Sequence, residues 1–99
     1  MNLDEVIALL AEKHQSVTYT ALAELFEVNR QTYMKERDNT PQNSWVVAAK
    51  TGLPTGYSDD EIDPALRAFI ENGGRPLGSV QDLRLWLLDN MPEEEGEGA

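Results

Sequence analysis

The sequence predicts a mainly helical fold with a small β-hairpin, in which a winged helix-turn-helix-like N-terminal part is followed by two C-terminal helices. Three observations lead to this prediction. Apolar residues recur at helical spacing in both halves of the chain, and a short valine-containing segment stands between two polar loops. The chain has 99 residues, which is enough for one hydrophobic core and not for two. We therefore expect a single domain over residues 1–91.

The first two helices have apolar stripes and suitable caps. Residues 3–14 carry leucine, valine and isoleucine at helical spacing, with two acidic residues in the first turn, where the helix dipole favours anions. Asn2 is a suitable N-cap for this helix. A second helix is expected over residues 19–26, with the Thr18 hydroxyl as its cap. Ala23 lies where two crossing helices need a small residue.

A third helix is expected over residues 30–38, with Asn29 as its N-cap. The second and third helices would then form a helix-turn-helix. Val28 would fill the turn between them with an apolar side chain, and Tyr33 would return to the core. Glu27 departs from this pattern, because it occupies the turn position that usually carries glycine.

The predicted hairpin follows a polar loop. Residues 45–49 are rich in β-forming side chains and predict a strand, and residues 50–52 give a tight-turn signal. We expect residues 53–55 to return as the second strand. Because Pro54 has no amide hydrogen, this strand can lie only at an edge. A helix-turn-helix followed by such a hairpin has the element order of a winged helix.

Two more helices are expected in the remainder. Ser58 and Glu61 have capping-box spacing and predict a short helical turn. Asp63 followed by proline predicts the start of a helix that ends at residues 72–74. Ser79 is a suitable cap for the last helix, whose apolar face is broad enough to need a partner, either the first helix or a second subunit.

The charge is unevenly distributed along the chain. The formal net charge is −10, which on average repels nucleic acid. Residues 1–57 carry five basic and seven acidic side chains, whereas residues 58–99 carry three and eleven. Cations cluster at positions 30–37. Residues 92–99 have no large apolar side chain, and we expect them to form a disordered acidic tail.

The cationic segment is the candidate nucleic-acid site. In a helix-turn-helix, the second helix presents its exposed face to the major groove, where such side chains contact phosphates or base edges. The candidate DNA-binding residues are Arg30, Gln31, Thr32, Lys35 and Arg37 on the predicted helix, and Lys50 and Thr51 at the hairpin tip. Glu36 and Asp38 dilute the positive charge.

Two functions remain open on this basis. The first is a small DNA-binding regulator with double-stranded DNA as its partner. The alternative is an acidic protein-interaction module, or a nucleic-acid mimic, that binds a basic protein through its C-terminal half. A homodimer is also left open, because most helix-turn-helix proteins reach useful affinity as dimers.

Four short segments resemble a known family. They are residues 17–23, 30–37, 45–47 and 52–57. Across residues 16–57 the chain resembles the DNA-binding domain of the alkylguanine-DNA alkyltransferase and alkyltransferase-like group, and the resemblance implies a winged-helix scaffold. The reactive centre of that family is a Pro-Cys-His-Arg run ahead of a Val-Val strand. Residues 41–45 of this chain are Pro-Gln-Asn-Ser-Trp, so alkyl transfer to the protein is excluded and lesion recognition is an analogy only.

Residue types that carry catalysis are scarce. Cysteine is absent, and the only histidine, His14, is expected to act as a cation near a helix end. The four acidic residues at positions 59–63 lack the spacing of a calcium-binding loop, and we expect them to cap helices or to lie in solvent. We therefore predict a protein that is not an enzyme and that uses no metal or cofactor.

The sequence also bears on where the large aromatic residues lie and on the compartment of the protein. Trp45, Tyr57 and Trp86 could stack on exposed bases, but core positions are expected for side chains of this size. The N-terminal residues are acidic where a secretory signal would be basic, and no stretch approaches the roughly 20 apolar residues that span a bilayer. We predict a cytoplasmic protein with no membrane partner.

Overall fold

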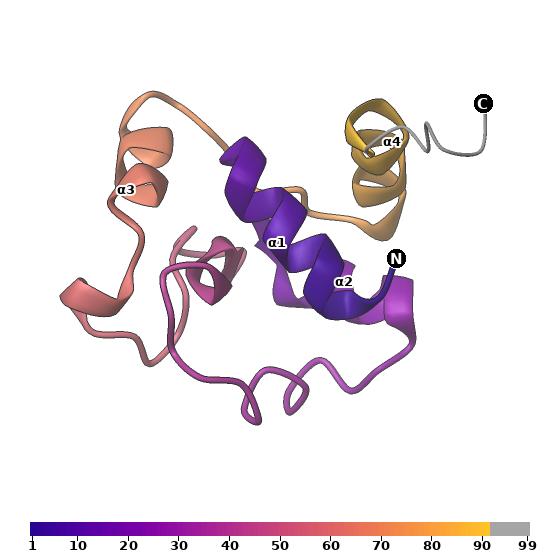
Figure 1. Ribbon diagram of the computed structural model, residues 1–99, viewed down its shortest axis with the longest axis horizontal. Coiled ribbons are helices and arrows are strands. Elements are labelled where there is room, and N and C mark those ends of the chain that lie inside the picture. The colour runs from indigo at the N-terminus through magenta and orange to yellow at the C-terminus, as the bar shows by residue number, and fades with distance from the viewer. Residues whose placement is uncertain (92–99) are drawn as a thin grey trace, which may run out of the picture.

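α-Helices form at four of the five segments where apolar stripes and caps predict them. The computed structural model describes residues 1–91, and the predicted acidic tail at 92–99 lies outside the described residues. The described chain contains four α-helices (Figure 1). They are α1 (Leu3–Lys13), α2 (Tyr19–Phe26), α3 (Pro64–Glu71) and α4 (Val80–Asn90). The mainly helical fold class is confirmed.

The predicted N-caps of these four helices are confirmed as well. Asn2 forms a capping box with Glu5 at the start of α1, in which both hydrogen bonds measure 2.8 Å. The side chains of Thr18, Asp63 and Ser79 each accept a hydrogen bond from a backbone N–H in the first turn of their helix. These caps satisfy amide groups that a helix cannot pair internally.

The predicted hairpin is wrong. The strands are β1 (Val17–Thr18) and β2 (Val46–Val47), they pair in parallel, and β2 follows a short 3₁₀ helix, η1 (Asn43–Trp45). Leu77 forms an isolated parallel bridge to Val17. Residues 53–55 are not a strand: the Leu53 carbonyl accepts a hydrogen bond from the Ala48 amide at 3.0 Å, but the Thr55 amide donates to the Tyr19 hydroxyl at 3.0 Å.

The predicted third helix is also wrong. Residues 29–37 form successive turns, in which the Lys35 amide donates to the Thr32 carbonyl at 2.9 Å and the Arg37 amide donates to the Met34 carbonyl at 3.1 Å. Val28 is 40% exposed and fills no turn. Helices this short depend on burying an apolar face, and this segment supplies too few buried side chains. A winged helix-turn-helix is therefore not confirmed.

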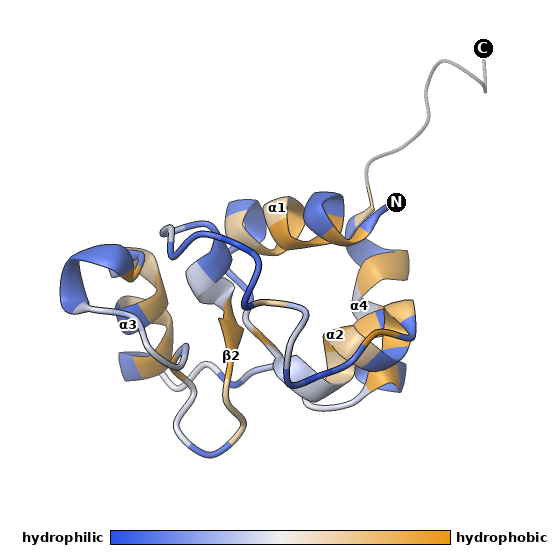
Figure 2. Cartoon of the chain, turned by 90° about the horizontal axis from the view of Figure 1, so that it is seen from below, coloured by the Kyte–Doolittle hydropathy of each residue, from blue (hydrophilic) through white to orange (hydrophobic). Residues whose placement is uncertain are grey.

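The strand β2 separates two apolar clusters. Successive strand residues point to opposite faces, so Val46 joins the cluster of α1, α2 and α4, whereas Val47 joins Trp45 and Leu66 beside α3. Figure 2 shows β2 as a hydrophobic strand with α3 on one side and α2 with α4 on the other. Within residues 1–91, no helix is long and apolar enough to cross a membrane.

Trp45 is a core residue, as predicted. It is fully buried, its ring stacks on His14 with centroids 5.5 Å apart, and its indole N–H donates to Asp63 at 3.0 Å. His14 is the C-cap of α1, so its predicted place at a helix end is confirmed. Asp63 therefore both caps α3 and satisfies the buried indole.

Candidate functional site

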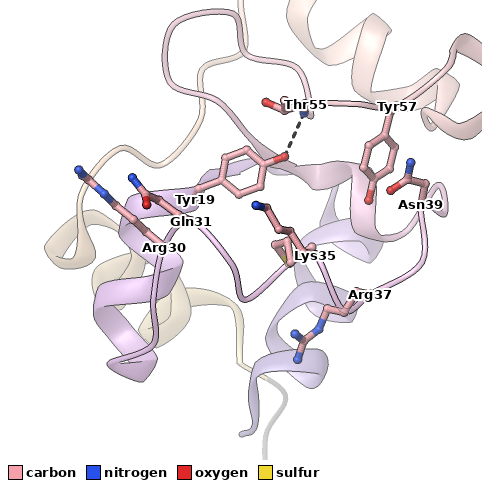
Figure 3. A pocket seen from close by; sticks show the side chains of 9 residues that line it. Tyr19, Arg30, Gln31, Lys35, Arg37, Asn39, Thr55 and Tyr57 are labelled. Atoms are coloured by element: carbon pink, nitrogen blue, oxygen red, sulfur yellow. Dashed lines mark hydrogen bonds between the residues drawn. The ribbon is translucent and has the colours of Figure 1, made fainter.

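A pocket of about 380 Å³ opens between the start of α2, the turns of residues 29–37 and the loop at residues 55–57 (Figure 3). It is lined by Tyr19, Arg30, Gln31, Met34, Lys35, Arg37, Asn39, Thr55 and Tyr57. Among the described residues, this lining contains three cations and no carboxylate, although the whole chain carries a net charge of −10. The pocket is therefore locally basic on a chain that is acidic overall.

Two tyrosine hydroxyl groups hold the walls of the pocket together. Tyr19 is the first residue of α2, and its hydroxyl accepts a hydrogen bond from the Thr55 amide at 3.0 Å (Figure 3). The Tyr33 hydroxyl donates to the Tyr19 carbonyl at 2.9 Å. These bonds fix both the loop and the turns to the start of α2, so the helix determines where the lining side chains lie.

Tyr57 supplies a neutral hydroxyl to the pocket. Burial, and then the neighbouring Tyr19 and Glu61, raises its pKa to about 12. At neutral pH the side chain is therefore an uncharged phenol, which does not repel an anion and can donate a hydrogen bond.

The loop that carries Tyr57 is held by Asn39 and Ser58. The Asn39 side-chain amide donates to the Gly56 carbonyl at 3.1 Å and to Glu61 at 3.3 Å, and the Ser58 amide donates to the same carboxylate at 2.9 Å. The hydrogen bonds from Ser58, followed by that from Asn39, hold the pKa of Glu61 below its usual range. The carboxylate is thus occupied in fixing the loop.

The predicted cations differ in their surroundings. Arg37 donates to Asp4 of α1 at 2.9 Å and to the Tyr33 carbonyl at 2.7 Å, and its guanidinium points away from the tyrosines (Figure 3). Arg30 and Lys35 form no ion pair with any carboxylate of residues 1–91. Lys35 is directed into the pocket (Figure 3). Two cations are therefore available to a ligand, and the third has a structural partner.

The structure brings four of the seven predicted site residues together. Arg30, Gln31, Lys35 and Arg37 line the pocket. Thr32 is exposed but does not line it, and Lys50 is exposed on a separate loop. Thr51 lines a small hollow beside α3 instead. Because the predicted hairpin is absent, no hairpin tip carries Lys50 and Thr51 toward the other cations.

Five of the lining residues were not predicted from the sequence. Tyr19, Met34, Asn39 and Thr55 had no expected role in a site, and Tyr57 was expected in the core. One available signal was the pair of tyrosines that flank the cationic segment, since aromatic and basic residues together are typical of nucleic-acid sites.

The lining offers groups that bind an anion by charge and by hydrogen bonds. Its side chains are cations, amides, hydroxyls and a thioether, and among the described residues none of them is a histidine or a carboxylate that could act as a general base. No group of three His, Asp or Glu side chains within residues 1–91 could hold a metal ion. The acidic residues at 59–63 have structural roles, since Asp59 pairs with Arg67 at 2.8 Å and Asp63 caps α3.

Comparison of the chain with protein-family models, with curated proteins and with solved structures gives no match. The resemblance of residues 16–57 to the alkyltransferase group stays a prediction. The pocket, and not the fold, bears on function, because a fold alone does not determine an activity.

Proposed function

We propose that the protein binds nucleic acid at the pocket. Arg30 and Lys35 contact phosphates, and an exposed base stacks against the ring of Tyr57. The observation that carries this proposal is the lining itself, which combines three cations with two tyrosines and, among the described residues, no carboxylate. Phosphates supply the negative charge that such a site attracts, and bases supply the flat ring that stacks on an aromatic side chain.

Single-stranded or locally unpaired DNA is the favoured form of this partner. Reading a duplex through the major groove requires an element such as a helix to enter the groove. Residues 29–37 form turns and present no such helix. An unpaired base has a free ring face and reaches a pocket more easily than a stacked one does.

The test is a titration of a labelled single-stranded oligonucleotide, followed by fluorescence anisotropy, at about 50 mM salt, where phosphate contacts are strong. The double variant Arg30→Ala with Lys35→Ala should weaken binding at least about tenfold. The matched control is Lys13→Ala with Arg75→Ala, which removes the same charge from exposed residues outside the pocket. Binding by the control should change much less.

Two results would contradict the proposal. One is the absence of binding by the unaltered protein at this salt concentration, and the other is an equal loss of affinity in the two double variants. The salt dependence gives a further check. With two phosphates contacted on a single strand, the slope of log K against log salt should be about −1.4.

A second candidate function is an acidic protein-interaction module. The uneven charge favours it, since residues 58–99 carry three basic and eleven acidic side chains. Glu71 and Asp82 are exposed and form no ion pair within residues 1–91. A lysine-rich peptide that binds the protein, and whose binding is lost on Glu71→Gln with Asp82→Asn, would support this function. The variant Arg30→Ala should bind this peptide as well as the unaltered protein does.

A further inference from the structure

The helix α4 exposes an apolar face that no element of residues 1–91 covers. Leu85 is 57% exposed and Leu88 is 77% exposed, and their spacing of three residues places them on one face of the helix. The opposite face packs on the core through Leu83, with Trp86 and Leu87 beside it. In Figure 1, α4 lies at the end of the molecule opposite α3, with α1 and α2 between them. Covering these adjacent leucines with a partner would remove apolar surface from water.

Opposite charges flank this leucine pair. Arg84 and Asp89 are both exposed, and neither forms an ion pair within the described residues. At about 100° per residue, Arg84 lies on one side of the leucines and Asp89 on the other. In heptad notation the run Arg84, Leu85, Leu88 and Asp89 occupies positions g, a, d and e.

We propose that this face of α4 binds α4 of a second copy of the chain, with the two helices parallel. In a parallel pair, residue g of one helix faces residue e of the next heptad on the other helix. Arg84 of each copy therefore faces Asp89 of its partner, and the twofold axis forms this pair twice. The four leucines are buried between the helices, which removes their apolar surface from water.

The order of the charges selects both the partner and the direction. Antiparallel pairing of the same faces places Arg84 beside the partner's Arg84, and Asp89 beside the partner's Asp89. Like charges opposed in this way disfavour the complex. Parallel pairing instead makes the face complementary to itself, as a twofold interface requires.

Further apolar surface lies beside the leucines. Met91 follows Leu88 by three residues and is 43% exposed. It lines an apolar groove of about 240 Å³ that also involves Met1 and Phe26. One heptad of contact is short, and Met91 adds one further exposed apolar side chain beside Leu88. The surface shares no lining residue with the cationic pocket, so the dimer proposal does not depend on the nucleic-acid proposal.

A single cysteine tests the direction of pairing, because the chain contains no other. Leu88→Cys should give a covalent dimer on mild oxidation, since parallel helices place position 88 next to itself within the few ångströms that a disulfide needs. The matched control, Lys13→Cys, lies on exposed α1 surface and should not cross-link. Cross-linking that requires a mixture of Leu85→Cys and Leu88→Cys chains would indicate antiparallel helices and overturn the proposal.

Sedimentation equilibrium tests the association itself. The chain of 11.1 kDa should double in mass over a range from about 10 μM to about 1 mM. Arg84→Glu and Asp89→Arg should each raise the dissociation constant about tenfold, because each opposes two pairs of like charges. An equimolar mixture of the two variants should recover the affinity, since the new carboxylates then meet the new guanidinium groups. A monomer throughout this range overturns the proposal.

Discussion

The helix α2 and the segment 29–37 follow one another in the chain, and both have features that predict a helix, yet only α2 is one. Each begins with a side chain that accepts a hydrogen bond from the backbone, Thr18 for α2 and Asn29 for the segment. They differ in burial. Residues 21–23 of α2 are all buried, whereas Tyr33 is the one buried residue of 29–37. Caps and propensity start a helix, but in a chain this small a buried face is needed to keep it.

The helix α2 and the turns of residues 29–37 also contribute different side chains to the pocket. The start of α2 provides Tyr19, to which both the turns and the loop are hydrogen bonded. The turns provide the cations. All three cations line the pocket, but Arg37 also donates to Asp4 of α1, whereas Arg30 and Lys35 form no ion pair within residues 1–91.

The largest effect is expected from truncation on the helical side of the comparison. Leu22→Ala should lower the free energy of unfolding by about 3 kcal/mol, because Leu22 is fully buried and its loss leaves a cavity. The matched change Met34→Ala in the turns should cost about 1 kcal/mol, because Met34 is only half-buried. Urea unfolding followed by circular dichroism measures both. Equal losses would show that the segment 29–37 is as firmly anchored as α2.

The next largest effect is expected on oligonucleotide binding, from replacing Tyr57 in the loop that faces the turns. Tyr57→Ala should weaken oligonucleotide binding by about 2 kcal/mol, the amount typical of one base stacked on an aromatic ring. Tyr57→Phe keeps the ring and should retain most of the affinity. Anisotropy titrations of the three proteins give the comparison, with circular dichroism to check that each is folded. If Tyr57→Phe loses as much as Tyr57→Ala, the hydroxyl rather than the ring makes the contact.

Features that depend on near neighbours were predictable from the sequence, and features that depend on distant partners were not. The caps at Asn2, Thr18 and Ser79 are correct because each joins a side chain to an amide three residues away. The partner of β2 was missed, because Val46 pairs with Val17 far back in the chain. The cations of the pocket were identified by their local clustering. Tyr19 was missed, since its contact with Thr55 spans 36 residues.

A smaller effect tests the bond between the two regions. Tyr33→Phe removes the hydroxyl that donates to the Tyr19 carbonyl and should cost about 1 kcal/mol of stability. It should also weaken oligonucleotide binding, because the turns that carry the cations lose their attachment to α2. Unfolding and binding are measured on the same variant. A stable variant with unchanged affinity would show that the turns keep their place without this bond.

The same bond predicts sensitivity to alkali. Burial, and then the neighbouring Tyr19, raises the pKa of Tyr33 above its usual value near 10. The neutral phenol is favoured in the folded state, so its contribution is complete below about pH 10 and is lost as the pH rises toward the raised pKa. The stability of Tyr33→Phe should therefore fall less than that of the unaltered protein when the pH is raised above 10. If both proteins lose the same stability above pH 10, groups other than Tyr33 cause the alkaline destabilisation.

The smallest effect is expected at the junction between the two regions, where Glu27 ends α2. Glu27 has a φ of 57°, a left-handed conformation that glycine adopts without the steric cost of a Cβ atom. Glycine usually occupies this position at the end of a helix, so Glu27→Gly should raise the free energy of unfolding by about 0.5 kcal/mol. Glu24→Gly is the control, because Glu24 lies inside α2 and its replacement should destabilise the helix by about 1 kcal/mol. If both changes lower the free energy of unfolding, the side chain of Glu27 stabilises the fold by more than its left-handed backbone conformation destabilises it.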